Sequence, residues 1–141
     1  MKNNKGFSLV EILVALALLG IVFTLVVPQV AKQFEQGKYD TTKLAMRSLI
    51  ERVKAYKRDC NRYPTTEQGL DALINKPVAA PECKRYAPEG YLENKELPKD
   101  AWDTDFYYES DGRVFELISF GADQAEGGEG FNADISSNKD L

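Results

Sequence analysis

The sequence predicts an α+β fold in which one long N-terminal helix packs on a small antiparallel sheet. Two patterns carry this prediction. From residue 46 to about residue 56, apolar residues recur at spacings of three and four, the period of an α-helix. Closer to the C-terminus, apolar and polar residues alternate, the period of a β-strand. A helix followed later by strands is typical of an α+β domain rather than of alternating βα units.

The expected helix runs from about Ser8 to Asp59, and its two halves differ in composition. Residues 7–31 carry one charge, that of Glu11. A helix over them measures about 37 Å, enough to cross a bilayer core of about 30 Å. The second half is amphipathic, with one apolar stripe for a globular core. The stripe consists of Met46, Leu49, Ile50, Val53 and Tyr56 or Lys57.

A short helix and a loop are expected after the long helix. The short helix covers Glu67 to about Ile74, with Thr65 or Thr66 as its N-cap. The stretch "NKPVAAPECKRYAPEG" follows, and its three prolines predict a loop.

A β-hairpin is expected beyond residue 100. Its apolar residues alternate with polar ones on both strands, and "SDG" at residues 110–112 supplies the turn. Trp102 is expected in the core. The inward-facing positions are Phe106 and Tyr108, then Phe115 and Leu117.

Composition argues against two broad classes of function. The chain has no histidine, the commonest general base and transition-metal ligand. Its two cysteines, Cys60 and Cys83, are too few for a structural zinc site, and no Ser/His or Cys/His catalytic pair can be assembled. A formal net charge of −4 argues against binding nucleic acid through its phosphates. We therefore expect neither an enzyme nor a nucleic-acid-binding protein.

The apolar segment admits three interpretations. A secretory signal peptide is disfavoured, because the apolar run exceeds the usual 7–15 or so residues and ends in "PQVA", without a small-x-small cleavage site. A plain membrane anchor explains the length but not Glu11, since an acid near mid-helix costs roughly 2.5–3.5 kcal/mol on insertion scales. In the third interpretation the chain is cut just before Phe7. The new amino group of one subunit then attracts the Glu11 carboxylate of its neighbour in the low-dielectric bilayer.

The flanking charges predict how the chain is oriented. Lys2 and Lys5 precede the apolar segment, so the positive-inside rule places the first residues in the cytoplasm and everything after residue 31 on the far side. A disulfide between Cys60 and Cys83 is permitted there. It would close a loop of about 24 residues and contribute roughly 3 kcal/mol. Two free, buried thiols are the alternative.

The N-terminal residues "KGFSLVEI" resemble the class III signal of type IV pilins and pseudopilins. That signal combines a basic leader, a glycine, an aromatic residue, a glutamate five residues in and an apolar run. The resemblance implies that a prepilin peptidase cleaves after Gly6 and methylates the new amino group of Phe7. It also implies that Glu11 pairs with the neighbouring subunit's N-terminus. Removal of residues 1–6 takes away two lysines and changes the formal net charge from −4 to −6.

Two further stretches, "YPTTEQGLDAL" and "SFGADQAEGGEGFNADI", resemble the major pseudopilins of type II secretion. The chain departs from that family in reading "DAWD" at residues 100–103, where Asp-Pro-Trp-Gly is usual, and in having a cysteine pair. The resemblance implies three parts: a leader over residues 1–6, an apolar transmembrane and assembly helix over 7–31, and a periplasmic pilin-like domain over 32–141.

The implied function is that of the major structural subunit of the type II secretion pseudopilus. This helical periplasmic fibre drives export of folded proteins across the outer membrane. The implied partners are further copies of the chain, minor pseudopilins, the prepilin peptidase, the inner-membrane assembly platform and the outer-membrane secretin. A type IV major pilin for surface adhesion or motility is the alternative, although such pilins more often close the C-terminal region with a disulfide. An anchored calcium-dependent hydrolase is a weaker rival, because no nucleophile–base pair is found.

The glycine-rich stretch at residues 121–134, "GADQAEGGEGFNAD", holds four acids and no cation. Glycines let a backbone turn its carbonyls inward, and carboxylate and carbonyl oxygens are what calcium prefers. The spacing is not that of an EF-hand, and a solvated loop is the alternative. Resemblance to the major pseudopilins, whose corresponding loop binds calcium, implies a structural calcium site. The expected ligands are the side chains of Asp123 and Asp134, with Glu129, Asn132 and the main-chain oxygen of Phe120 as further candidates.

Gly20 and Pro28 are poor helix formers within the long helix. A modest kink is the commoner consequence of a proline in a membrane helix. The pilin resemblance implies instead that residues 20–28 melt and stretch when subunits pack into a fibre.

Overall fold

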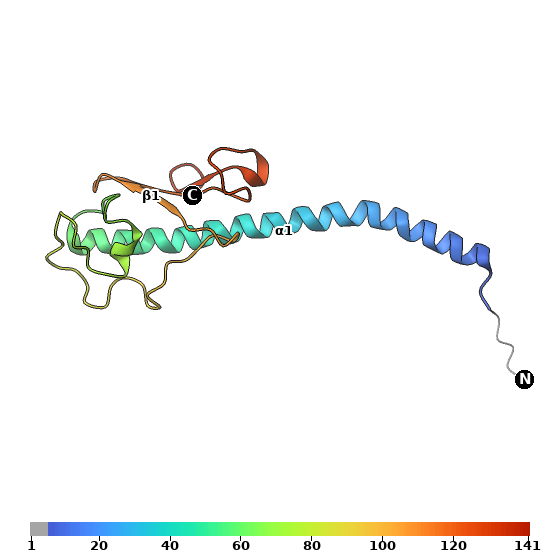
Figure 1. Cartoon of the computed structure of the whole chain (residues 1–141), viewed down its shortest axis with the longest axis horizontal. Helices are drawn as coiled ribbons and strands as arrows, with labels where there is room; N and C mark the ends of the chain where they lie inside the picture. The colour runs from blue at the N-terminus through green and yellow to red at the C-terminus, as the bar shows by residue number, and fades with distance from the viewer. Residues whose placement is uncertain (1–5) are drawn as a thin grey trace, which may run out of the picture. The chain divides into compact units, whose positions relative to one another are not determined.

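The computed structural model describes residues 6–141. These divide into two compact units, of which the first ends at Gln36 and the second begins at Gly37. The leader expected over residues 1–6 therefore lies outside the described residues except for Gly6. A single long helix, α1, covers Leu9–Cys60 and provides the whole regular structure of the first unit. The second unit holds the core and the sheet (Figure 1).

Helix α1 confirms the long helix expected from the periodicity, within about one residue at each end. It continues through Gly20 and Pro28 without a break in its helical assignment. The stretching of residues 20–28 in a fibre stays a prediction, since it concerns an assembled state.

The apolar stripe of α1 forms one side of the core. Met46, Leu49, Val53 and Tyr56 are fully buried, whereas Ile50 is half-buried and Lys57 is exposed. Tyr56 therefore occupies the last position of the stripe. The stripe begins one turn earlier than expected, at Thr42, a fully buried residue whose hydroxyl accepts a hydrogen bond from the backbone N–H of Ala101 at 3.1 Å.

The sheet has three antiparallel strands in the order β1-β2-β3, and its apolar face covers the same core. Strand β1 (Tyr107–Ser110) pairs with β2 (Phe115–Ser119), which confirms the hairpin. Its turn spans residues 111–114 and is longer than the expected "SDG", because the Asp111 carboxylate accepts hydrogen bonds from the backbone N–H groups of Arg113 and Val114. Strand β3 (Ile135–Ser136) was not expected; two residues carry no detectable period.

The short helix expected over residues 67–74 is shorter than predicted. The structure has a 3-10 helix, η1, at Leu70–Leu73. Gly69 interrupts the segment with a φ of 60°, a left-handed conformation outside a helix. The expected threonine, Thr65, does make capping hydrogen bonds, but it lies about one turn before η1 begins. The Thr65 hydroxyl accepts from the backbone N–H of Gln68 at 3.3 Å, and the Gln68 side chain accepts from the backbone N–H of Thr65 at 3.1 Å, as in a capping box.

The "DAWD" turn is held by a buried aspartate. Asp100 is only 5 % exposed and accepts hydrogen bonds from the backbone N–H groups of Trp102 and Thr104 and from the hydroxyl of Ser119. Asp103 adopts a φ of 64°, which explains why glycine is usual at this position in the family it resembles. Trp102, which was expected in the core, is partly buried and packs against it.

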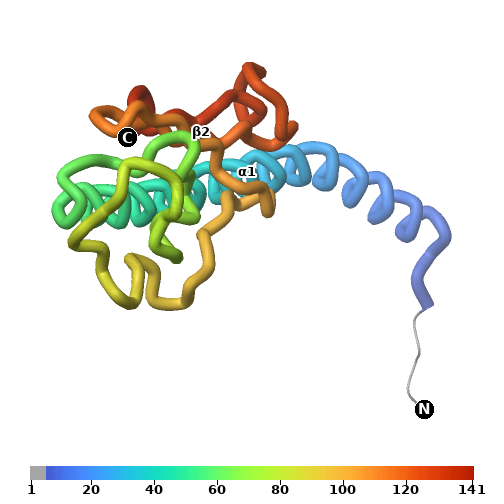
Figure 2. Tube along the Cα trace, turned by 60° about the vertical axis from the view of Figure 1, so that its left-hand side comes forward, coloured from blue at the N-terminus to red at the C-terminus, as the bar shows by residue number. Residues whose placement is uncertain are grey.

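Two long irregular segments complete the second unit. The loop of residues 75–98 lies on one side of α1, and the C-terminal strands and loops lie on the other (Figures 1 and 2). A second 3-10 helix, η2 (Gly130–Asn132), belongs to the C-terminal side.

Candidate functional site

The start of α1 has an apolar surface that the subunit itself does not cover. Every residue from Gly6 to Phe34 is exposed, including large side chains such as Leu9, Phe23 and Val30. By length and composition this helix is suited to cross a membrane, and none of its apolar window is buried within the protein. An apolar surface of this extent requires lipid or another chain to cover it.

Glu11 lies in the first turn of α1, where the helix dipole favours a negative charge. Its Oε2 accepts a hydrogen bond from the backbone N–H of Ser8 at 3.3 Å, a long contact of the capping type. Gly6 and Phe7 precede the helix and are exposed, so a protease can reach the bond between them. The expected cleavage site thus lies just before the helix, with Phe7 four residues ahead of the acid.

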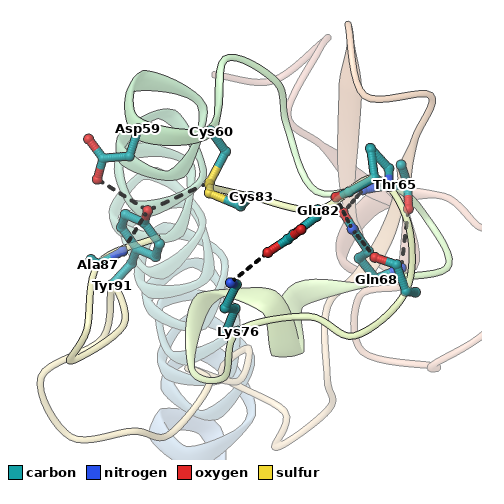
Figure 3. Close-up of a disulfide and its surroundings, with 11 residues drawn as sticks. Asp59, Cys60, Thr65, Gln68, Lys76, Glu82, Cys83, Ala87 and Tyr91 are labelled. Atoms are coloured by element: carbon teal, nitrogen blue, oxygen red, sulfur yellow. Dashed lines mark hydrogen bonds and ion pairs between the residues drawn. A yellow bond between two sulfur atoms is a disulfide. The ribbon is translucent and has the colours of Figure 1, made fainter. Parts of the chain in front are cut away.

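Cys60 and Cys83 form a disulfide that joins the last residue of α1 to the loop of residues 75–98 (Figure 3). Their Cα atoms are 4.9 Å apart, within the range that a disulfide bridges. Cys83 is 2 % exposed, and among the described residues no cysteine is free. The alternative of two free thiols is therefore wrong for this structure.

Tyr91 makes a hydrogen bond to α1 beside the disulfide. Its hydroxyl donates to Oδ2 of Asp59 at 3.1 Å and lies 3.9 Å from the sulfur of Cys60 (Figure 3). Burial, together with the neighbouring Asp59 carboxylate, raises the pKa of Tyr91 from 10.0 to about 12. Sequence reasoning missed this contact, because Tyr91 and Asp59 are separated by 32 residues and share no motif.

Residues 121–134, hereafter the acidic loop, fold back on themselves. The backbone N–H of Ala122 donates to the carbonyl of Phe131 at 3.1 Å, and that of Asp134 donates to the carbonyl of Gly127 at 3.1 Å. A Cβ added to Gly121 would stand 3.0 and 2.9 Å from the carbonyl oxygens of Phe131 and Ala133. Glycine at 121 therefore leaves room for two main-chain oxygens to approach the opposite limb of the loop.

Asp134 is the expected ligand whose surroundings are most unusual. Its Oδ2 accepts a hydrogen bond from the backbone N–H of Gly127 at 2.9 Å. Its Oδ1 is buried and has no hydrogen-bond partner among the described residues. A buried carboxylate oxygen without a hydrogen-bond partner lowers the stability of the fold by about 1–3 kcal/mol or more, unless a cation is present. The donor set at this point fits a hard cation.

The other expected ligands are spread along the acidic loop. Asp123 is exposed, and its Oδ1 accepts a 3.2 Å hydrogen bond from the backbone N–H of Ala125. Glu129 and Asn132 are exposed at the two ends of η2, and Phe120 directly follows β2. Over residues 6–141 no three acidic or cysteine side chains gather closely enough to hold a metal by themselves. Main-chain oxygens would have to complete any cation site here, as calcium permits.

The fold and the exposed apolar helix define a class of protein: a membrane-anchored, pilin-like subunit with a globular head. Two family models match the chain. The first describes type II secretion system (T2SS) protein G and matches residues 29–138; the second describes the prokaryotic N-terminal methylation motif and matches residues 1–27.

Individual relatives agree with the family models. The chain is 40 % identical over 138 residues to type II secretion system core protein G of Pseudomonas aeruginosa, with 96 % of each chain covered. It is 39 % identical over 139 residues to the protein of that name in Vibrio cholerae, covering 97 % of this chain and 93 % of the relative. The crystal structure of the major pseudopilin from the type 2 secretion system of enterohaemorrhagic Escherichia coli superimposes with a TM-score of 0.65. Its sequence is 32 % identical, and 74 % of this chain and 86 % of that one are covered.

The chain belongs to the type II secretion system protein G family. It is a structural pseudopilin subunit, anchored by its apolar helix and assembling with itself and other secretion components, and it is not an enzyme. These relatives support a pseudopilin and not a surface type IV pilin, which corrects the alternative.

Proposed function

We propose that this chain is the major subunit of a periplasmic pseudopilus whose growth drives folded proteins across the outer membrane. The observation that carries the proposal is the apolar start of α1, which is exposed throughout in the isolated subunit. A helix of this kind is held by the bilayer before assembly and by the helices of other subunits afterwards. In this proposal residues 7–31 span the inner membrane and residues 32–141 occupy the periplasm.

Processing prepares the subunit for assembly. A prepilin peptidase cleaves between Gly6 and Phe7 and methylates the new amino group. Cleavage replaces a neutral amide with a cation in a low-dielectric layer. There the Glu11 carboxylate of the adjacent subunit attracts it and sets the register between the two helices. Minor pseudopilins, the inner-membrane assembly platform and the outer-membrane secretin are the further partners of this fibre.

Mass spectrometry of intact fibres tests the processing step. The expected chain begins at an N-methylated Phe7; fibres built from chains that still begin at Met1 would exclude the proposal. Glu11→Gln tests the register, because it keeps the side-chain shape and removes the charge. We expect fibres and secretion to be lost in Glu11→Gln and kept in Asp105→Asn, an exposed acid in the head. Equal secretion by the two variants would contradict the register role.

We also propose that the acidic loop binds calcium. The unpartnered, buried Oδ1 of Asp134 supports this, together with the carbonyl oxygens that crowd Gly121. Asp134 and main-chain oxygens would hold the ion, with the Asp123 carboxylate as a second charged ligand. Bound calcium would neutralise mutual repulsion among the acids and order the backbone of the loop.

Thermal melting of the full chain in detergent tests the calcium site. At a calcium concentration of about 100 times Kd, binding should stabilise the head by about 2.7 kcal/mol relative to chelated protein. Asp134→Asn should abolish this difference and Asp105→Asn should leave it intact. An unchanged melting temperature on chelation of the unsubstituted protein would refute the site.

A further inference from the structure

Five exposed cations lie within three residues of Cys60 or Cys83 in sequence, at the C-terminal end of α1 and in the loop bonded to it. They come from two segments, one on each side of the bond, and the 4.9 Å separation of the Cys60 and Cys83 Cα atoms brings these segments together. We call this surface the basic pole. It consists of Lys57, Arg58, Arg62, Lys84 and Arg85.

The basic pole keeps an excess of positive charge within the subunit. Across residues 6–141, no carboxylate forms a salt bridge with any of the five cations. Of the two nearest acids in sequence, Glu82 pairs with Lys76 at 3.0 Å, and Asp59 accepts a hydrogen bond from the Tyr91 hydroxyl (Figure 3). Asp59 keeps its negative charge and offsets one of the five positive ones. Lys57 lies 4.2 Å above the ring of Tyr63, a contact that leaves its charge in place.

The acidic loop lies well back along α1 from the basic pole. Two hydrogen bonds show where along α1 the loop begins. The backbone N–H of Ala101 donates to the hydroxyl of Thr42 on α1, and the hydroxyl of Ser119, two residues before the loop, donates to the neighbouring Asp100 at 2.7 Å. Thr42 precedes Cys60 by eighteen residues, or about 27 Å of helix. In Figure 1 the red loop lies apart from the green end of α1.

The two charged surfaces are too far apart to neutralise each other. The Debye length at physiological ionic strength is about 8 Å, so a separation of about 27 Å is screened. Across a direct contact between two subunits, the same charges would lie within a few ångströms. Two different surfaces at opposite ends of one body make a heterologous contact, which extends into an open helical filament where the rotation between copies does not close into a ring.

We propose that the basic pole of one subunit contacts the acidic loop of a second copy of this chain, stacked along the direction of α1. This inference rests on the fibre proposed above and identifies one contact within it. Calcium does not remove the complementarity, because the loop carries four acids and a divalent cation neutralises two of those charges. The disulfide, which is not general in the family this chain resembles, assembles the basic half of the contact.

Charge reversal in the full chain tests this contact in cells that assemble fibres. Arg85→Glu and Glu126→Lys should each lower the yield of sheared fibres about tenfold, and the double variant should recover most of the yield. Glu126 is used because it is exposed and is not among the expected calcium ligands. Lys139→Glu and Glu96→Lys, exposed charges outside both surfaces, are the matched controls and should assemble normally.

A photo-crosslinking amino acid at position 85 gives an independent readout. It should capture residues 121–134 of another copy in fibres. Single reversals that assemble normally, a double variant as poor as either single one, or capture of a different segment would each overturn the inference. Each variant must retain the disulfide and the melting temperature of the unsubstituted protein. If the unsubstituted chain forms no fibres, the proposed function fails; if it forms fibres that the reversals leave unaffected, this contact alone fails.

Discussion

The loop of residues 75–98 and the acidic loop are held in place by different kinds of interaction. Both are long and mostly irregular, and the entropy of closing such a segment opposes its order. The first is fastened covalently through Cys83 and by the Tyr91–Asp59 hydrogen bond. The second has glycines, internal backbone bonds and a buried carboxylate oxygen without a partner. The first loop is held covalently once oxidised, whereas under the calcium proposal above the second would reach full order only with the ion bound.

Removing the disulfide should have the largest effect on this comparison. The double substitution Cys60→Ser with Cys83→Ser frees a loop of about 24 residues and should lower the free energy of unfolding by about 3 kcal/mol. Urea denaturation measures the loss, and reduction of the unsubstituted protein should reproduce it. Calcium should stabilise the oxidised and reduced proteins equally, because the two loops are independent. A calcium effect that disappears on reduction would contradict that independence.

Gly128→Ala should destabilise the acidic loop by about 2–3 kcal/mol. Gly128 has a φ of 79°, a conformation that costs other residues about 1–2 kcal/mol, and an added Cβ would overlap the carbonyl oxygen of Asn132. Gly130→Ala is the matched control: its φ is 64°, but no atom lies within 4 Å of the added Cβ. Urea denaturation should therefore rank Gly128→Ala well below Gly130→Ala in stability. Equal losses would mean that the Asn132 carbonyl moves away without cost.

Alkaline pH should lower the free energy of unfolding of the second unit, because its buried tyrosines ionise. Burial raises the pKa values of Tyr91 and Tyr108 from 10.0 to about 12. Because the folded-state values lie above the unfolded ones, this stabilisation is complete below pH 10 and is lost as pH rises through about 12. The expected loss is on the order of 1–2 kcal/mol, measured by melting at pH 9, 10 and 11. In Tyr91→Phe the loss over this range should be smaller; an identical pH dependence would rule out Tyr91 as a contributor.

Two tyrosines of the first loop should differ when their hydroxyls are removed. Tyr91→Phe deletes the hydrogen bond to Asp59 and should cost about 1 kcal/mol. The hydroxyl of Tyr86 is buried without a hydrogen-bond partner among the described residues. Tyr86→Phe should therefore change the free energy of unfolding by less than about 0.5 kcal/mol or raise it. A clear destabilisation in Tyr86→Phe would reveal a bridging water at that site.

Sequence predicted the elements that carry a long, clear period. The 52 residues of α1 and the buried Tyr108 and Leu117 of the hairpin followed from apolar spacing, whereas Phe115, which was expected to face inward, is only half-buried. Strand β3 did not, because two residues cannot display a period, and its place is set by pairing with β2. The short helix was overestimated, because Gly69 adopts a left-handed conformation that a propensity argument does not detect.

The candidate sites divide along similar lines. Glu11 and the cysteine pair stood out because each is chemically unusual in its surroundings. The acidic loop was singled out by its composition, but its folded-back path was not predicted, since contacts between its two limbs depend on the glycine conformations. The calcium site itself stays a prediction. The basic pole was missed, because its two segments are separated in sequence and only the disulfide brings them together.

The uncovered apolar start of α1 also limits where the energy for fibre growth can come from. Lipid tails are about as apolar as the leucine and valine side chains of neighbouring helices, so moving this segment from bilayer to fibre removes little apolar surface from water. The hydrophobic effect therefore contributes almost nothing to extraction itself. The free energy that favours the fibre over the membrane must therefore come from other terms, such as the proposed Glu11 pairing and the contacts between heads, or from an external source of energy.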